Sequence, residues 1–185
     1  MNVSWVAADR FILDPTVDVE SLKSIGPIWG SWTTWRSCGT DNVVCHDPAK
    51  AQELVARGFH NKANFFTHRS YYQQLNRPQG VKLYDGSYTE QVDSLEDIIA
   101  LHLAAASSDI VLLLGFQFGK LELPKDQFEQ HKSINRHGLM RSIIAKNPTI
   151  QWVAIDHPKQ LDPKYQELTN LTCDKLKSVL KLLAQ

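Results

Sequence analysis

The stretch "DIVLLLGF", residues 109–116, is the most hydrophobic run in the sequence. Its length and its polar flanks are typical of a strand in the centre of a parallel sheet, where helices cover both faces. The preceding stretch, "DSLEDIIALHLAAASS" at 93–108, predicts a well-buried helix, because its apolar residues cover much of the circumference. Ser94 and Asp97, three residues apart, predict a capping box at the start of that helix.

Apolar runs and helical patterns alternate along the rest of the chain. The predicted strands, besides 109–116, lie at 2–8, 43–45, 63–68, 80–86 and 149–158. The predicted helices, besides 93–108, lie at 11–26, 47–58, 69–76, 126–147 with a break near Gly138, and 162–183. Residues 25–42 contain few signals of regular structure.

The order of these elements predicts the fold class. Strands that alternate with helices and read as apolar runs indicate a mostly parallel sheet that is covered on both faces. No internal repeat or linker interrupts the pattern. We therefore expect an α/β protein with a single Rossmann-like three-layer domain over residues 1–185.

Composition excludes several classes of function. Lys and Arg together number 20, as do Asp and Glu, so the net charge is zero and general nucleic-acid binding is not expected. No apolar run approaches the roughly 20 residues of a membrane span. The N-terminal residues do not resemble a signal peptide, and three cysteines are typical of reduced thiols. These features predict a cytoplasmic protein.

Polar side chains follow each predicted strand. In open parallel sheets, ligands bind beyond the carboxyl ends of the strands, near a switch in strand order. The residues that follow the predicted strands are Asp9, Arg10, His46, Asp47, His68, Arg69, Asp85, Gly86, Gln117, Lys120, Asp156 and His157. Of these we select His46, Asp47, Gln117, Lys120, Asp156 and His157 as candidates, together with Gly115. Two interpretations stay open: a genuine pocket, or strands that simply end where polarity begins.

Known motifs are incomplete in this sequence. A zinc site would draw on Cys38, Cys45, His46, His60 and His68, but the spacing of the two cysteines is not that of a zinc knuckle. The "GFQFGK" stretch at 115–120 has only three residues between its glycines, and Leu121 replaces the Ser or Thr of a P-loop. The glycine fingerprint of dinucleotide-binding folds is also missing. We therefore expect no metal and no cofactor.

Three tryptophans lie at intervals of three residues in "WGSWTTWR", residues 29–36. They suit a satellite core that plugs the end of the sheet. Alternatively, Trp32 and Trp35 form an aromatic wall beside Arg36, which binds an anion bidentately. Such a wall is typical of a surface that binds a sugar or a nucleotide.

The chain resembles a family of uncharacterised proteins from T-even-type tailed phages, including phages of cyanobacteria. The resemblance rests on the sequence from "RFILDP" through "GPIWGSWTTWRSCGTDNVVCHD", and on "KLYDG", "HLAAASSDIVLLLGF", "NRHGL" and "QWVAIDHP". It implies a protein that acts in the host cytoplasm, and it transfers no catalytic residue. A weaker likeness joins "SSDIVLLLGFQF" to Rossmann-like bacterial sialyltransferases, although Gln117 stands where that pattern is acidic.

Two functions follow from these residues. In the first, the chain binds, or acts on, an anionic small molecule such as a nucleotide or sugar-nucleotide at the carboxyl edge of the sheet. His46 or His157 would be the general base, oriented by Asp47 or Asp156. In the second, the chain is a non-catalytic interaction protein that binds a host protein or associates with itself through its C-terminal helix.

Overall fold

The computed structural model describes residues 1–9, 11–85, 95–120, 124–157 and 161–183. Its centre is an eight-stranded sheet with the order β5-β4-β3-β2-β1-β6-β7-β8, and each pair of neighbouring strands is parallel. The strands are β1 (Val3–Ala7), β2 (Ile28–Ser31), β3 (Asn42–Val44), β4 (Asn64–His68), β5 (Lys82–Tyr84), β6 (Ile110–Leu114), β7 (Gln151–Ile155) and β8 (Leu171–Asp174). The α/β class and the parallel sheet are therefore confirmed.

The hydrophobic run at 109–116 forms β6, which lies between β1 and β7. Its side chains alternate between two cores. Leu113 packs with Val6 and Trp152 on one face, while Leu112 and Leu114 pack on the other. Burial on both faces explains why this strand is apolar at every position.

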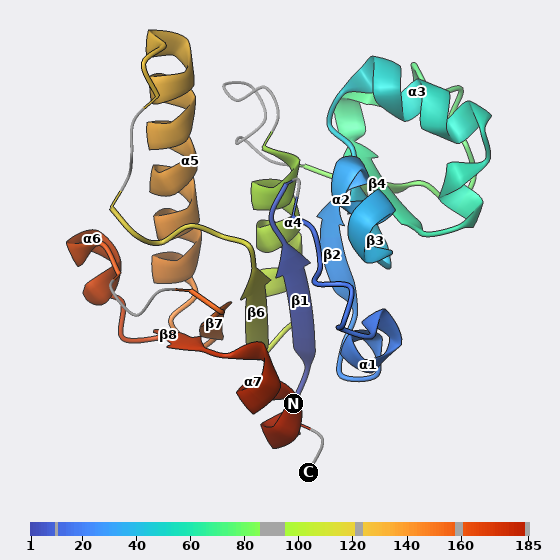
Figure 1. Ribbon diagram of the computed structural model, residues 1–185. Coiled ribbons are helices and arrows are strands. Elements are labelled where there is room, and N and C mark those ends of the chain that lie inside the picture. Colours follow the sequence, from blue (N-terminus) through green and yellow to red (C-terminus); the bar gives the residue numbers. More distant parts are fainter. Residues whose placement is uncertain (10, 86–94, 121–123, 158–160, 184–185) are drawn as a thin grey trace.

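Helices cover both faces of the sheet (Figure 1). The helices are α1 (Val19–Lys23), α2 (Trp32–Cys38), α3 (Pro48–Ala56), α4 (Glu96–Ala105), α5 (Gln127–Lys146), α6 (Pro163–Gln166) and α7 (Leu176–Leu183). Two short 3-10 turns are η1 (Phe59–Asn61) and η2 (Arg69–Tyr71). The α4 and α5 helices share one core with the sheet, whereas α1, α2 and α7 share the other.

The predicted start of α3 is confirmed. The Asp47 side chain accepts hydrogen bonds from the backbone N–H groups of Ala49 and Lys50, and Pro48 occupies the first helical turn. The predicted capping box of α4 involves Ser94, which lies outside the described residues. Asp97, the other member of that pair, is fully buried and binds two other segments.

The prediction for residues 25–42 was wrong, because this stretch forms β2 and α2. Ser31 caps α2 by accepting a hydrogen bond from the Thr34 N–H, and Gly39 ends the helix with a φ of 56°. Gly30 is close-packed in β2, since a Cβ there would lie 3.1 Å from Thr40 Cγ2. Ile28 and Trp29 are both buried, so the strand gains its stability from packing.

Further boundaries differ from the predictions. The helix predicted at 11–26 is shortened to α1, and the one predicted at 69–76 is the 3-10 turn η2 followed by turns. The helix predicted at 162–183 is divided into α6, β8 and α7, and β8 extends the sheet by pairing with β7. The α5 helix continues through Gly138 without a break. A helical glycine costs only about 1 kcal/mol, and burial of Met140, Ile143 and Ile144 holds the second half of α5 in place.

Among the described residues, no helix combines the length and the apolar character needed to cross a membrane.

We expect Leu113→Asp to prevent folding, because Leu113 is 1% exposed and an unpaired buried charge costs several kcal/mol. Leu182→Asp is the control, because Leu182 in α7 is 72% exposed. Soluble yield and the cooperativity of thermal unfolding measure the effect. A Leu113→Asp protein that is soluble and melts cooperatively would contradict the central position of β6.

Candidate functional site

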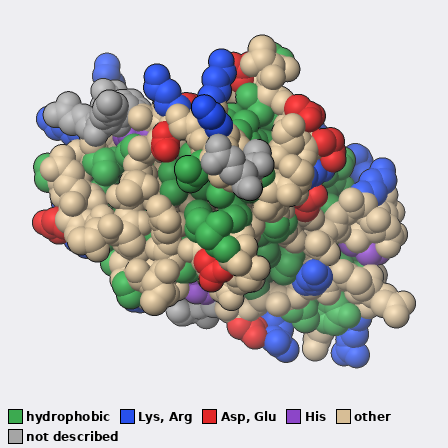
Figure 2. Space-filling view, turned by 90° about the horizontal axis from the view of Figure 1, so that it is seen from below, with side chains coloured by type: hydrophobic (Ala, Val, Ile, Leu, Met, Phe, Trp, Pro, Cys, Tyr) green, Lys and Arg blue, Asp and Glu red, His purple; other side chains and the backbone are tan. Residues whose placement is uncertain are grey.

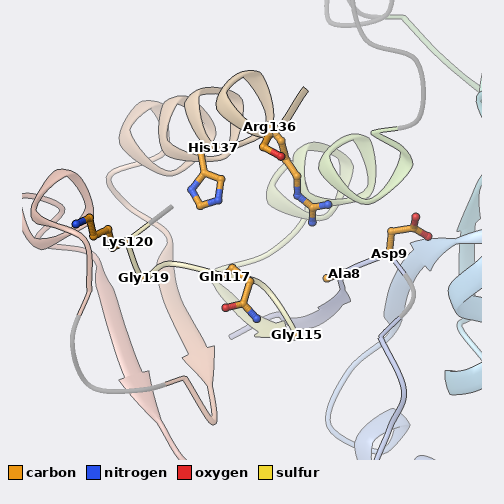
Figure 3. Close-up of a pocket in the computed structure, with 9 residues that line it drawn as sticks. Ala8, Asp9, Gly115, Gln117, Gly119, Lys120, Arg136 and His137 are labelled. Atoms are coloured by element: carbon orange, nitrogen blue, oxygen red, sulfur yellow. The ribbon is translucent and has the colours of Figure 1, made fainter. Parts of the chain in front are cut away.

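The carboxyl ends of β1 and β6 are the point at which the strand order reverses. From β1 the chain builds the sheet outward through β2 to β5, and then returns to place β6 on the other side of β1. The loops that follow β1 and β6 therefore diverge, which is the usual position of a ligand in open parallel sheets. A hollow of about 590 Å³ lies here. We call it the switch-point hollow, and it is lined by Ala8, Asp9, Gly115, Gln117, Gly119, Lys120, Ser133, Arg136 and His137 (Figure 3).

In the loop after β6, buried aromatic side chains alternate with exposed positions, so polar groups face this hollow. Phe116 and Phe118 are buried, whereas Gln117 and Lys120 are exposed. Gly115 has a φ of 74°, and a Cβ there would lie 2.4 Å from the Phe11 ring. Glycine is therefore required at position 115 for the close approach of the segment after β1.

Asp97 holds together both sides of the switch-point hollow. Its Oδ2 accepts a hydrogen bond of 2.8 Å from the Asp9 N–H and an ion-pair contact from the Arg136 guanidinium. Burial raises the pKa of Asp97, while the charge of Arg136 acts in the opposite direction. Because Asp97 belongs to α4, one buried carboxylate fixes the end of β1 and the middle of α5 against each other.

Asp9 forms the acidic end of the hollow. Its Oδ1 accepts hydrogen bonds from the hydroxyls of Ser31, at 2.9 Å, and Thr33. These contacts join the start of α2 to the end of β1. Figure 3 shows Asp9 and Lys120 at opposite ends of the hollow, with Gln117 and Arg136 between them.

His137 lies on α5 beside Arg136. Its Nδ1 is 3.2 Å from the Tyr165 hydroxyl, which also donates to the His137 carbonyl. Burial lowers the pKa of His137, and the neighbouring Arg136 lowers it further. The positive charge of the hollow at neutral pH therefore comes from Lys120 and Arg136.

The predicted catalytic residues are not brought together. Asp156 Oδ1 accepts a hydrogen bond from the Leu176 N–H at the start of α7. His157 Nε2 accepts a hydrogen bond of 3.0 Å from the Phe118 N–H, so His157 supports the loop after β6 from behind. Of this pair, only His157 is connected to the hollow, and that connection runs through the loop backbone.

His46 lies in a separate polar cluster at the ends of β3 and β5. It is 7% exposed, its Nδ1 is 2.9 Å from the Tyr84 hydroxyl, and its N–H donates to Glu96. Asp47 follows and caps α3. Burial raises the pKa of Glu96 from 4.5 to about 7, although its bonds to backbone N–H groups oppose the shift.

The prediction that the tryptophans pack in a core is confirmed: Trp29 is buried in the main core, and Trp32 and Trp35 pack against a separate, smaller core. Trp32 packs beneath two cations, with Lys50 Nζ 4.5 Å and Arg36 Cζ 5.4 Å from its ring centroid. Trp35 and Arg36 line a second hollow with Asp41 and Asn64, which lie at the amino ends of β3 and β4. Placing Arg36 at the carboxyl edge was therefore wrong, because α2 runs back along the sheet and its last turn reaches the opposite edge.

The described residues contain no group of three or more His, Cys, Asp or Glu side chains arranged to hold a metal ion. Cys38 and Cys45 are buried in different cores, so the two cysteines of the zinc set considered from the sequence do not meet.

Sequence reasoning missed three residues of this region: Glu96, Asp97 and Arg136. Glu96 and Asp97 are carboxylates in the first turn of a helix, a position that solvated caps commonly occupy. The available signal was the apolar character of α4, which is buried over most of its surface and therefore buries these carboxylates as well.

Comparisons with protein-family models, with curated proteins and with solved structures find no match for the chain.

We expect the stability of the protein to decrease between about pH 4.5 and about pH 7 because of Glu96. Its pKa is higher in the folded state than in the unfolded chain, so the folded state binds more protons across this range. The free energy of unfolding therefore falls as pH rises through this range, by up to about 3 kcal/mol, and levels off above it.

Glu96→Gln should remove this contribution while keeping an acceptor oxygen for the His46 N–H. Urea unfolding at a series of pH values measures it. Glu129→Gln, at an exposed position of α5, is the matched control. If Glu96→Gln and wild type lose stability in parallel over this range, another group is responsible.

Proposed function

We propose that the chain binds a small phosphate-bearing molecule, of the nucleotide or sugar-nucleotide class, in the switch-point hollow. The observation that carries the proposal is that Lys120 lies at one end of the hollow, Asp9 at the other and Arg136 between them, at the point where β1 and β6 separate. The position is the one that ligands occupy in open parallel sheets, and the charges indicate which parts of a ligand would meet which end.

The basic side of the hollow suits a phosphate. Lys120 is exposed, and no carboxylate of the described residues lies within 4.0 Å of its ammonium group. Gly119 lies beside it, and a Cβ there would meet nothing within 4 Å, so the backbone is open to a ligand. Arg136 shares its guanidinium with Asp97 and keeps 28% of its side chain exposed toward the hollow.

The acidic end suits a group that donates hydrogen bonds. The hydroxyls of Ser31 and Thr33 hold the Asp9 carboxylate in place, and a carboxylate accepts further hydrogen bonds from sugar hydroxyls. A free inorganic anion would be repelled by Asp9, whereas a sugar phosphate presents hydroxyls to Asp9 and phosphate to Lys120. This polarity favours a phosphorylated sugar or nucleoside over a simple anion.

The proposal is limited to binding. His46, Asp156 and His157 each take part in contacts away from the hollow's lining, so they do not support a shared catalytic role. The phage relationship, the location in a host cytoplasm and the alternative of an interaction protein stay predictions from the sequence.

We expect ADP or UDP-glucose to raise the melting temperature of the full chain. A ligand at 100 times its dissociation constant stabilises by about 2.7 kcal/mol. Lys120→Ala should weaken binding about tenfold or more, because hydrogen bonds between charged groups contribute about 1.5–3 kcal/mol. Lys146→Ala is the control, since Lys146 is exposed at the other end of α5. Thermal shift and calorimetric titration measure both variants.

The role of Asp9 is tested with ligands, because Asp9 also holds β1 and α2 together. The dideoxy analogue of ADP, which lacks the ribose hydroxyls, should bind more weakly than ADP. Equal effects of the two lysine variants would reject the hollow as the binding site, and equal binding of both nucleotides would reject the assignment of Asp9.

A further inference from the structure

A second hollow, of about 750 Å³, lies at the amino ends of β3 and β4. We call it the amino-edge hollow. Its walls come from the last turn of α2, the loop before β3 and the segment between η1 and β4, and they include Trp35, Arg36, Thr40, His60 and Lys62. It uses none of the residues that line the switch-point hollow.

The amino-edge hollow has a net positive charge, because Asp41, the one carboxylate of its described lining, is paired with Lys23 and two further cations remain. Lys23 and Asp41 lie 3.6 Å apart and neutralise each other, and Asp41 also accepts a hydrogen bond from the Ile28 N–H. Among the described residues, neither Arg36 nor Lys62 has a carboxylate within 4.0 Å.

Glu53 is the carboxylate whose pKa Arg36 affects, and it already forms ion pairs with two other cations. Glu53, whose pKa is lowered chiefly by its hydrogen bond to Lys50 and to a smaller extent by Arg36, is 2.6 Å from Lys50 Nζ and 2.9 Å from Arg57. Arg36 also rests over the Trp32 ring, which restricts its guanidinium without satisfying its hydrogen-bond donors. The fold thus supplies a positioned guanidinium whose charge is not used internally.

Two buried polar groups in the wall of this hollow also have no partner. Thr40 Oγ1 and His60 Nδ1 are both buried without a hydrogen bond within the described part of the chain. Both atoms are shielded from solvent, so a ligand in the hollow would meet the exposed cations Arg36 and Lys62 rather than these two groups. Both groups belong to the same hollow as Arg36 and Lys62.

We infer that the amino-edge hollow is a second binding site, and that it takes a small phosphate-bearing molecule. Arg36 provides the planar fork that matches two phosphate oxygens, and Lys62 provides a second charge. Trp35 forms the aromatic wall of the site, with its ring fixed edge-on against Phe59 at 4.5 Å between centroids. A phosphorylated compound with a ring fits both features.

The number of cations favours a short ligand over a nucleic-acid strand. Only Arg36 and Lys62 lack an internal ion-pair partner in this hollow, whereas strand binding uses many phosphate contacts along a groove. Figure 2, which views the molecule from the amino edge of the sheet, shows basic and acidic side chains intermixed around a band of hydrophobic ones. No stripe of a single charge crosses this face.

The test is an NMR titration of the full chain with inorganic pyrophosphate. The backbone amide signals of Thr40, Asp41 and Asn61 should shift saturably. Arg36→Ala should weaken that dissociation constant about tenfold or more, which is the loss expected for a bidentate charged contact. Lys181→Ala, which removes an exposed cation from α7, and Lys120→Ala, which alters the other hollow, should leave it within about twofold.

Three results would overturn the inference. One is the absence of saturable shifts at these amides at a dissociation constant of about 1 mM or tighter. Another is equal weakening by Arg36→Ala and Lys181→Ala, which would indicate general charge attraction. The third is tighter binding of a single-stranded oligonucleotide than of pyrophosphate at the same amides, which would replace a small ligand with a nucleic acid.

Discussion

The buried carboxylate of Asp97 is the constraint on which the carboxyl edge of the sheet depends. A carboxylate with no exposed surface is stable only when hydrogen bonds and opposite charge replace water. Asp97 meets this requirement at Oδ2, which binds the Asp9 N–H and the Arg136 guanidinium, whereas Oδ1 is buried without a hydrogen-bond partner among the described residues. The same two contacts fix the end of β1 and the middle of α5, so stability and the shape of the switch-point hollow have one origin.

The loop after β6 depends on a second packing constraint. Phe116 and Phe118 enter the core, and His157 accepts the Phe118 N–H from the adjacent strand end. Gly115 allows the Phe11 ring to close over the strand end. The loop leaves Gln117 and Lys120 at the surface, so a largely apolar segment presents polar groups to the switch-point hollow.

The sequence predicted those parts of the fold whose signals are local. The apolar run of β6 and the Asp47–Pro48 start of α3 required no knowledge of tertiary structure. The β2 strand was missed because four residues containing a glycine and a serine gain their stability from neighbouring strands. The β8 strand was missed for a related reason, since pairing with β7 overrides a helical pattern.

The sequence indicated where in the sheet the candidate site lies, but not all of the residues that form it. The carboxyl ends are the usual ligand position in open parallel sheets, and Gly115, Gln117 and Lys120 line the switch-point hollow there. Arg136 was missed because a helix residue reaches the hollow only through the packing of α5 against α4. Arg36 was assigned to the wrong edge because α2 was not recognised, and the direction of a helix decides which end of the sheet its last turn meets.

The pairing of β1 with β6 has a consequence for how the chain folds. Val3 is the register partner of Ile110, which follows it by 107 positions, so the two central strands meet only after a long segment has been synthesised. Until then, one edge of β1 can pair only with segments that are not its native neighbour, and non-local pairing of this kind folds slowly. The time during which the nascent chain is vulnerable to misassembly is therefore set by the same strand order that creates the hollow.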